Sequence, residues 1–187
     1  MTGALRIRCA RIAAAAAIAS VVGCAPHVVP PESAVTAPRI AEDALIAPDG
    51  ARLALQRWMP AGPPRAVVLA LHGFNDYANG FDLPARQLAA AGIITYAYDQ
   101  RGFGRTATRG RWSGSVLLVA GAAMAARLLR ARHPGAPLYL LGESMGGAVA
   151  LLASAEAAAP ADGAILVAPA VWGRRHISWF RQGVLDL

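Results

Sequence analysis

The sequence predicts an α/β fold in which helices cover both faces of a mostly parallel sheet. Residues 66–73 (AVVLALHG) form a continuous apolar run that stops abruptly at His72-Gly73, as buried parallel strands do. Further strand-like runs alternate with helical segments at short connections, which is the pattern of βαβ units. The length of 187 residues and the hydrophobic content of 56% suit one globular domain with a substantial core.

The expected elements begin with a β-hairpin at residues 44–60, because two short apolar runs flank the turn residues Pro48-Asp49-Gly50. Residues 83–92 predict a helix that ends at Gly92, and residues 93–102 predict the next strand. A longer helix is expected from Ser113 or Ser115 up to Pro134-Gly135. The remaining pattern predicts a strand at 137–142, a helix at 145–159 and a strand at 163–170.

The N-terminus has the features of an export signal. Arg6, Arg8 and Arg11 precede an apolar run at residues 12–22, which is shorter than the roughly 20 residues of a membrane span. The run ends in Val21-Val22-Gly23-Cys24, which resembles the lipobox of bacterial lipoproteins. The resemblance implies that residues 1–23 are removed and that Cys24 is lipidated. The alternative is an ordinary signal peptide that happens to contain a cysteine.

The sequence therefore divides into a signal peptide at 1–23, a proline-rich tether at 24–41 and a domain at 42–187. Cys9 would leave with the signal, so no disulfide is expected in the mature chain. An alanine follows Cys24, as in outer-membrane lipoproteins of Gram-negative bacteria. We therefore expect a lipid-anchored protein of the cell envelope, on the periplasmic side of the outer membrane if the organism is Gram-negative.

The net charge of +7 does not indicate a nucleic-acid partner. All 18 basic residues are arginines, and they are scattered without a dense stripe between aromatic residues. The composition leaves the oligomeric state open.

A candidate nucleophile lies between the strand at 137–142 and the following helix. Residues 142–146 (GESMG) fit the pattern G-x-S-x-G in the strand–turn–helix context that the pattern requires. Gly142 and Gly146 suit a crowded, strained turn that lifts the hydroxyl of Ser144 clear of the sheet. The amide of Met145, at the helix N-terminus, is placed to stabilise an oxyanion. The alternative is a glycine-rich turn without a nucleophile.

A second motif follows the strand at 66–73. The loop after such a strand supplies the other oxyanion-hole amide in hydrolases of this pattern, and here that amide belongs to Phe74. His72 precedes the serine in the chain and ends a strand. We therefore expect His72 and Gly73 to shape the loop and not to act as the general base.

Three ordered segments carry a family resemblance. The segments at 71–82 (LHGFNDYANGFD), 98–106 (YDQRGFGRT) and 140–150 (LLGESMGGAVA) resemble the monoacylglycerol lipase and lysophospholipase branch of the α/β-hydrolase superfamily, also described as serine-aminopeptidase-like hydrolases. The resemblance covers roughly residues 44–170. It implies an α/β-hydrolase fold, Ser144 as nucleophile, and Phe74 and Met145 as backbone oxyanion donors.

The same resemblance implies the reaction and its partners. Acyl transfer to the serine would be followed by hydrolysis with water, without a metal or an organic cofactor. The implied substrates are carboxylic esters of acyl lipids, of the monoacylglycerol or lysophospholipid type. The membrane would be contacted through the lipidated Cys24.

The glycines at the end of the strand at 93–102 also suggest a second, weaker hypothesis, a dinucleotide-binding loop. Residues 102–107 (GFGRTA) match a degenerate dinucleotide-binding pattern, but a lone match is weak, and the absence of lysine excludes a Walker A loop. Arg101 and Arg105 could contact an anionic head group, although we expect them to fix the loop or to face solvent.

The sequence does not show an obvious acid and histidine to complete a catalytic triad with Ser144. In α/β-hydrolases an acid and then a histidine follow the serine along the chain. Here the acids after Ser144 are Glu156, Asp162 and Asp186, and the one histidine is His176. None has the expected position, and a makeshift pair of Asp162 with His176 is the poorer explanation.

We therefore expect the triad acid and histidine to lie beyond this chain, so that the α/β-hydrolase domain is C-terminally incomplete and ends at the start of the cap. The expected activity of such a chain is weak or absent. The rival hypothesis from another class is a non-catalytic lipoprotein, either a remnant or a binding module on a hydrolase scaffold.

Overall fold

The computed structural model describes residues 28–156, 161–171, 173 and 178. The predicted signal peptide, Cys24, His176 and Asp186 lie outside the described residues. Residues Val28–Trp172 form one unit, and the following description is of this unit.

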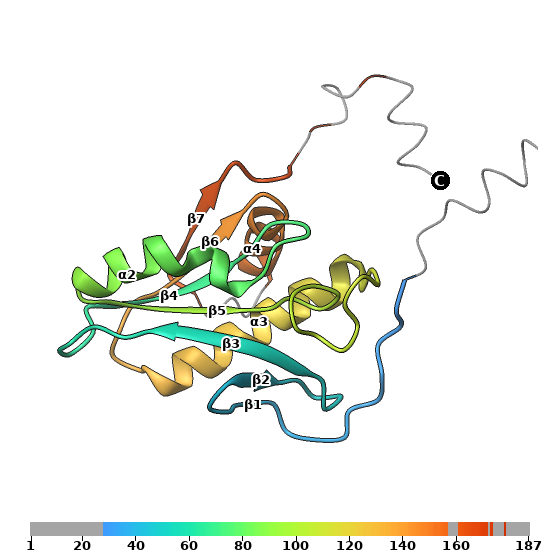
Figure 1. Cartoon of the computed structure of the whole chain (residues 1–187), viewed down its shortest axis with the longest axis horizontal. Coiled ribbons are helices and arrows are strands. Elements are labelled where there is room, and N and C mark those ends of the chain that lie inside the picture. Colours follow the sequence, from blue (N-terminus) through green and yellow to red (C-terminus); the bar gives the residue numbers. More distant parts are fainter. Residues whose placement is uncertain (1–27, 157–160, 172, 174–177, 179–187) are drawn as a thin grey trace, which may run out of the picture. The chain divides into compact units, whose positions relative to one another are not determined.

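Seven strands form one sheet in the described part of the chain (Figure 1). The strands are β1 (Arg39–Ile40), β2 (Ala44–Ile46), β3 (Arg52–Trp58), β4 (Ala66–Leu71), β5 (Ile93–Tyr98), β6 (Leu138–Glu143) and β7 (Gly163–Val167). The helices are η1 (Ala78–Phe81), α2 (Asp82–Ala90), α3 (Gly114–Arg132) and α4 (Met145–Ala155). Each element expected from the sequence is present, and β1 and η1 were not predicted.

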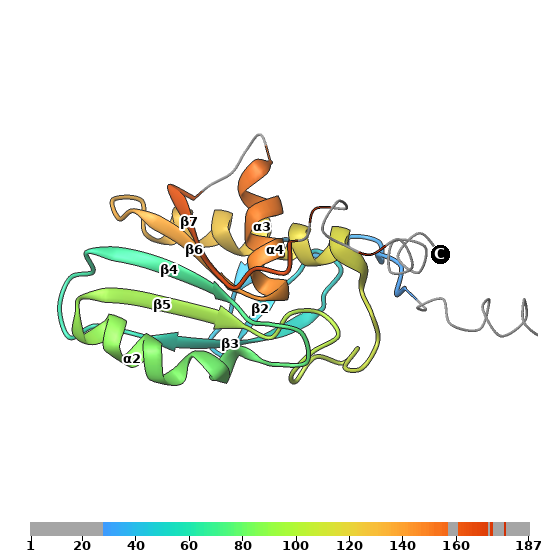
Figure 2. The same ribbon diagram turned by 90° about the horizontal axis from the view of Figure 1, so that it is seen from above.

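The strand order is β1-β2-β3-β5-β4-β6-β7. The strands β5, β4, β6 and β7 pair in parallel, whereas β1, β2, β3 and β5 pair antiparallel. Helix α2 covers one face of the sheet, and α3 and α4 cover the other (Figure 2). The predicted α/β fold with helices on both faces is thereby confirmed, and the predicted hairpin forms its antiparallel side.

The segment before the hairpin packs against the domain. The amide of Val29 donates to the carbonyl of Trp112 at 2.8 Å, and the amides of Val35 and Thr36 donate to Pro48 at 2.8 and 3.0 Å. Arg39–Ile40 then adds the short edge strand β1 to the sheet. Ordered pairing thus begins inside residues 24–41, before the predicted end of the tether.

The core has two parts, one on each face of the sheet. The larger part lies beneath α3 and α4, where alternate residues Val67, Leu69 and Leu71 of β4 are fully buried. The smaller part, beneath α2, contains Ala70 and Phe81. Helix α3 is long and apolar enough to cross a membrane by length and composition. Its buried side chains pack on the sheet and on α4, so we assign it to the core.

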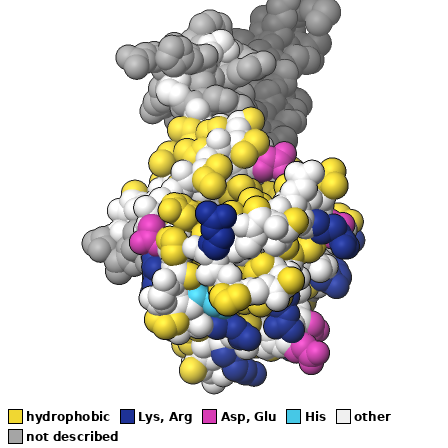
Figure 3. Space-filling view, turned by 90° about the vertical axis from the view of Figure 1, so that its left-hand side faces the viewer, with side chains coloured by type: hydrophobic (Ala, Val, Ile, Leu, Met, Phe, Trp, Pro, Cys, Tyr) yellow, Lys and Arg dark blue, Asp and Glu magenta, His cyan; other side chains and the backbone are white. Residues whose placement is uncertain are grey.

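The other edge strand, β7, is poorly covered within the described part. Its side chains Ile165, Leu166 and Val167 are between 38% and 47% exposed, and Leu151 and Leu152 of α4 are also exposed. Figure 3 shows apolar side chains gathered in the upper part of this unit, at the level of β7 in Figure 1, with arginines spread over the part below. The sequence also predicts that residues 164–169 (AILVAP) form an unprotected edge strand, and in the described residues β7 does lie at the edge of the sheet with exposed side chains.

Candidate active site

The parallel strands bring three sequence-distant loops together at their carboxyl ends. The chain leaves β4 for β5 on one side and later returns to β6 on the other side of β4. Ligands of open α/β sheets bind at such a switch point, outside the carboxyl ends of the strands. His72 follows β4, Asp99 follows β5 and Ser144 follows β6, so the polar residues lie where a site is expected.

Ser144 occupies a sharp turn between β6 and α4. Its backbone has φ 51° and ψ −116°, a conformation that non-glycine residues rarely adopt. Its amide donates to the carbonyl of Val167 at 2.9 Å, and its carbonyl accepts from the amide of Ala170 at 2.9 Å. These bonds from β7 and the loop after it hold the strained residue in place.

The glycines around Ser144 are required by close backbone contacts. A Cβ atom on Gly146 would collide with the carbonyl oxygen of Leu71 at the end of β4. A Cβ atom on Gly142 would collide with the carbonyl oxygen of Gly146, and one on Gly147 would lie 2.8 Å from Cβ of Pro169. The start of α4 can therefore rest directly on β4 and β6 because these three positions have no side chain.

The two predicted oxyanion donors flank the serine. Gly73 lies beside Ser144, since a Cβ atom on Gly73 would be 3.4 Å from Cβ of Ser144. Phe74 follows it directly, and Met145 is the first residue of α4. Within the described part, neither the amide of Phe74 nor that of Met145 donates a backbone hydrogen bond outside the regular elements. The oxyanion role of these two amides stays a prediction, and no backbone hydrogen bond in the described part contradicts it.

His72 is fixed in its neutral form. It is fully buried, its Nδ1 donates to the carbonyl of Gly73 at 2.8 Å, and its Nε2 accepts from the amide of Gln100 at 3.0 Å. A backbone N–H can only donate, so Nε2 carries no proton. Burial lowers the pKa of His72 and outweighs the Gly73 hydrogen bond and the carboxylates of Asp99, Asp76 and Glu143, which raise it. Both ring nitrogens are occupied within the loops, as expected for a residue that shapes the loop.

Asp99 ties the loops together, a role that the sequence did not indicate. Its Oδ1 accepts from the amide of Ala78 at 2.9 Å and its Oδ2 from the amide of Arg105 at 2.7 Å. The guanidinium of Arg105 also lies 3.5 Å from Oδ2. Arg101 forms a largely buried ion pair of 2.8 Å with Asp49 of the hairpin turn. Both arginines fix the loop after β5, which confirms the expected structural role.

The acids that follow Ser144 are not beside it in the described residues. Glu156 caps the far end of the eleven-residue helix α4. Asp162 lies at the amino ends of β6 and β7, where it accepts from Arg130 at 2.6 Å and from the amide of Leu138 at 2.7 Å. The hydrogen bond from Arg130 lowers the pKa of Asp162 and keeps it ionised. The structure therefore separates Asp162 from Ser144 by the length of the sheet.

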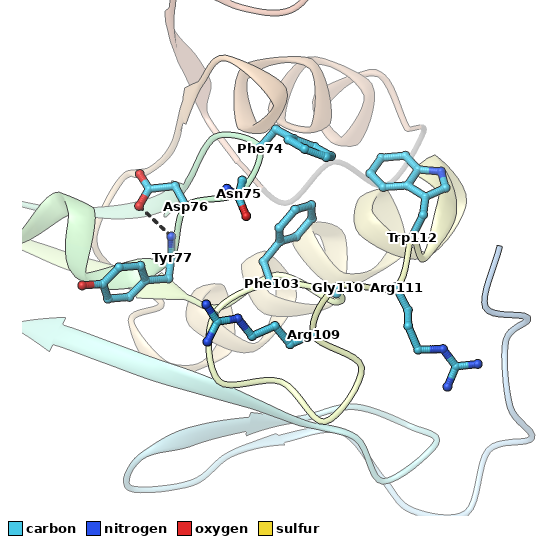
Figure 4. Close-up of a pocket in the computed structure, with 11 residues that line it drawn as sticks. Phe74, Asn75, Asp76, Tyr77, Phe103, Arg109, Gly110, Arg111 and Trp112 are labelled. Atoms are coloured by element: carbon cyan, nitrogen blue, oxygen red, sulfur yellow. Dashed lines mark hydrogen bonds between the residues drawn. The ribbon is translucent and has the colours of Figure 1, made fainter. Parts of the chain in front are cut away.

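A cavity of about 340 Å³ opens beside the loop that carries Phe74 (Figure 4). The rings of Phe74 and Phe103 meet edge to face with their centroids 5.4 Å apart, and Trp112 lies 6.4 Å from Phe74. The loop residues Asn75, Asp76, Tyr77, Arg109 and Arg111 complete the polar part of the lining. Among the residues that the structure describes, no group of three or more His, Cys, Asp or Glu side chains could hold a metal ion.

Comparison with known proteins decides the family. Residues 62–187 match the family described as serine aminopeptidase, S33. This chain belongs to that family. It is 31% identical to human monoglyceride lipase over 128 residues, which are 68% of this chain and 42% of the relative. It is also 31% identical to a monoacylglycerol lipase of Mycolicibacterium smegmatis over 123 residues, 65% of this chain and 44% of the relative. The chain thus spans less than half the length of these curated relatives.

Solved structures support the fold. A soluble variant of monoglyceride lipase from Saccharomyces cerevisiae superposes with a TM-score of 0.60 at 21% identity, covering 77% of this chain and 47% of that one. A lipase in its open form gives a TM-score of 0.61 at 24% identity, covering 67% and 43%. The α/β-hydrolase fold and the family resemblance read from three motifs are thereby confirmed.

The contact of Gly146 with β4 predicts a large stability effect. Gly146→Ala should lower the free energy of unfolding by about 3 kcal/mol or more. The cost of forcing a Cβ atom against a backbone carbonyl is larger than the roughly 1 kcal/mol by which alanine stabilises a helix relative to glycine. Denaturant unfolding followed by circular dichroism measures the difference. Gly135→Ala is the matched control, since its Cβ atom would meet nothing within 4 Å, and should change stability by less than about 0.5 kcal/mol. Equal stability of the two variants would contradict the close contact.

The neutral state of His72 predicts a pH dependence. The pKa of the folded state is lowered below the ordinary value of 6.5, so the stability contributed by His72 is complete above pH 6.5 and is lost as pH falls below it. In ¹⁵N-resolved NMR spectra, His72 should be protonated at Nδ1 and should not titrate near pH 6.5. A second ring proton appearing at pH 6.5 in the folded chain would show that the assigned hydrogen bonds are wrong.

Proposed function

We propose that this chain carries the nucleophile of a serine hydrolase that cleaves carboxylic esters of acyl lipids, of the monoacylglycerol or lysophospholipid type. The observation that carries the proposal is the strained turn at Ser144, where φ is 51° in a residue that is not glycine. Such strain persists where the surrounding structure enforces it, and it concentrates at active sites. Membership of a family whose matched relatives include monoglyceride lipases supports the ester as substrate.

In the proposed reaction, Oγ of Ser144 attacks the ester carbonyl carbon. The negative charge on the carbonyl oxygen is stabilised by the amides of Phe74 and Met145. The serine proton passes through a base to the departing alcohol as the C–O bond breaks, which leaves an acyl-Ser144 ester. Water then attacks this ester, returns a proton to the serine and releases the fatty acid.

The base of this reaction is not His72 or His133. His72 accepts a backbone N–H at Nε2, and Nε2 of His133 lies 3.1 Å from the hydroxyl of Tyr96, next to the end of α3. The hydroxyl of Ser144 has no hydrogen-bond partner within the described part of the chain. No histidine in the described part of the chain is placed to act as the base of Ser144, and we propose that this chain alone turns over esters slowly, because a serine without its triad partners loses most of the rate.

A fluorophosphonate probe tests the nucleophile. Ser144 should form a slow, stoichiometric adduct at alkaline pH, detected by intact-protein mass spectrometry, and Ser144→Ala should abolish the adduct. Ser154→Ala is the matched control, since Ser154 lies on the same helix and its hydroxyl donates to the carbonyl of Ala150 at 2.8 Å. No adduct, or an adduct that survives in Ser144→Ala, would overturn the catalytic proposal and favour a binding module.

The turnover of a short-chain nitrophenyl ester tests the second part of the proposal. The full chain should hydrolyse the ester at a rate close to that of Ser144→Ala. Fast turnover that depends on Ser144 would instead show that a competent base is present.

We further propose that the protein is anchored through Cys24 in the cell envelope, on the periplasmic side of the outer membrane in a Gram-negative host. The support is the apolar run at 12–22 and the lipobox-like residues Val21–Cys24 in the sequence. Expressed in a Gram-negative host, the chain should incorporate radiolabelled palmitate and fractionate with membranes. Cys24→Ser should remove both properties, whereas Cys9→Ser should change neither. A soluble, unlabelled protein with Cys24 intact would indicate an ordinary signal peptide.

A further inference from the structure

The cavity of Figure 4 contains a cationic side chain beside an aromatic wall. Four arginines lie on the loop after β5. Two of them form ion pairs, Arg101 with Asp49 and Arg105 with Asp99. Neither Arg109 nor Arg111 forms an ion pair within the described residues. Figure 4 shows Arg109 extending beneath Phe103 toward Tyr77, whereas Arg111 points away from the aromatic rings. Both arginines line the cavity, and Arg109 is the one whose side chain extends past the ring of Phe103.

The one acid of the lining does not neutralise this charge. The Oδ1 atom of Asp76 accepts from the amide of Tyr77 at 2.8 Å. Its carboxylate is turned toward η1, because a Cβ atom on Gly80 would lie 2.8 Å from Oδ2. Figure 4 shows the carboxylate directed away from Arg109. The cavity thus presents a guanidinium without a carboxylate partner among the described residues.

The cavity and the candidate nucleophile share one loop. Phe74 forms part of the cavity wall, and the preceding Gly73 abuts the side chain of Ser144. Ser144 does not itself line the cavity, so the placement of a ligand's alcohol part in the cavity, with its ester carbonyl at Ser144, is part of the inference that follows. The volume of about 340 Å³ lies within the usual range of small-molecule sites, about 300–1,000 Å³.

We infer that Arg109 is a specificity-determining residue that binds a phosphate group on the alcohol part of the acyl ester. A guanidinium matches the geometry of phosphate oxygens and forms strong charge-assisted hydrogen bonds with them. The apolar rings of Phe74, Phe103 and Trp112 suit the carbon atoms between the phosphate and the ester. The inference rests on the proposed function and narrows it, since it selects glycerophosphate esters over the uncharged glycerol esters for which the matched relatives are named.

Calorimetric titration of the full chain carrying Ser144→Ala, in a non-ionic detergent, tests the inference without turnover. The probes are 1-octanoylglycerol 3-phosphate and 1-octanoylglycerol, which differ by the phosphate. The phosphate probe should bind about tenfold more tightly or better, as expected for hydrogen bonds to a charged group. Arg109→Gln should remove this preference and leave the affinity for the uncharged probe within about twofold.

Three controls separate the explanations. Arg57→Gln removes one exposed positive charge on β3, far along the chain from the cavity residues, and should keep the preference. Equal affinity for the two probes, or a loss in Arg57→Gln as large as in Arg109→Gln, would overturn the inference. Displacement of the probe by inorganic phosphate at an equal concentration would also overturn it, because the site would then bind free phosphate and not a substrate group. Fluorophosphonate labelling of the parent chain distinguishes this failure from failure of the proposed function. If Ser144 is labelled but the two calorimetric probes bind equally, only the inference about Arg109 is overturned. If Ser144 is not labelled, the proposed function and the inference are both overturned.

Discussion

The site depends on the direct contact of the α4 N-terminus with the end of β4. The carbonyl of Leu71 occupies the space that a side chain at Gly146 would need, so the helix can start immediately behind the sheet. At this contact the chain turns sharply from β6 into α4, and Ser144 takes a strained conformation with positive φ. Such a conformation costs about 1–3 kcal/mol, which the hydrogen bonds to Val167 and Ala170 help to offset. The position of the hydroxyl thus follows from backbone packing.

The other loops are held by buried polar groups that link one strand end to the next. His72 joins the loop after β4 to Gln100, and Asp99 joins the loop after β5 to Ala78 and Arg105. Both ring nitrogens of His72 and both carboxylate oxygens of Asp99 are paired with backbone groups, as buried polar atoms usually are. The two loops are therefore joined into one wall, which carries Phe74 and Phe103. The loop beside Ser144 and the loop that lines the cavity are held by the same network.

The sequence predicted the strands, the helices and the turn at Ser144, because each depends on a local pattern of apolar residues and glycines. It did not predict β1 (Arg39–Ile40), a two-residue strand that follows a segment hydrogen-bonded to Pro48 and Trp112, which are distant in the sequence. It also missed the role of Asp99, whose partners lie 21 residues before it and six after it. The glycine pattern of GFGRTA also did not reveal why Gly104 is needed: a Cβ atom at this position would collide with the carboxylate of Asp99. Long-range pairing decides these features, and local spacing does not encode it.

The geometry of the nucleophile and the identity of its base are physically separate. The turn at Ser144 is built by β4, β6, α4 and the residues after β7, all of which lie in the described chain. A general base adds proton transfer to a serine that is already in place, and it contributes nothing to the backbone contacts that hold the serine there. The amides of Phe74 and Met145, which we propose as oxyanion donors, belong to the loop after β4 and to the start of α4. A well-formed turn is therefore strong support for the fold and for acyl chemistry, whereas the rate of turnover depends on groups that this turn does not position.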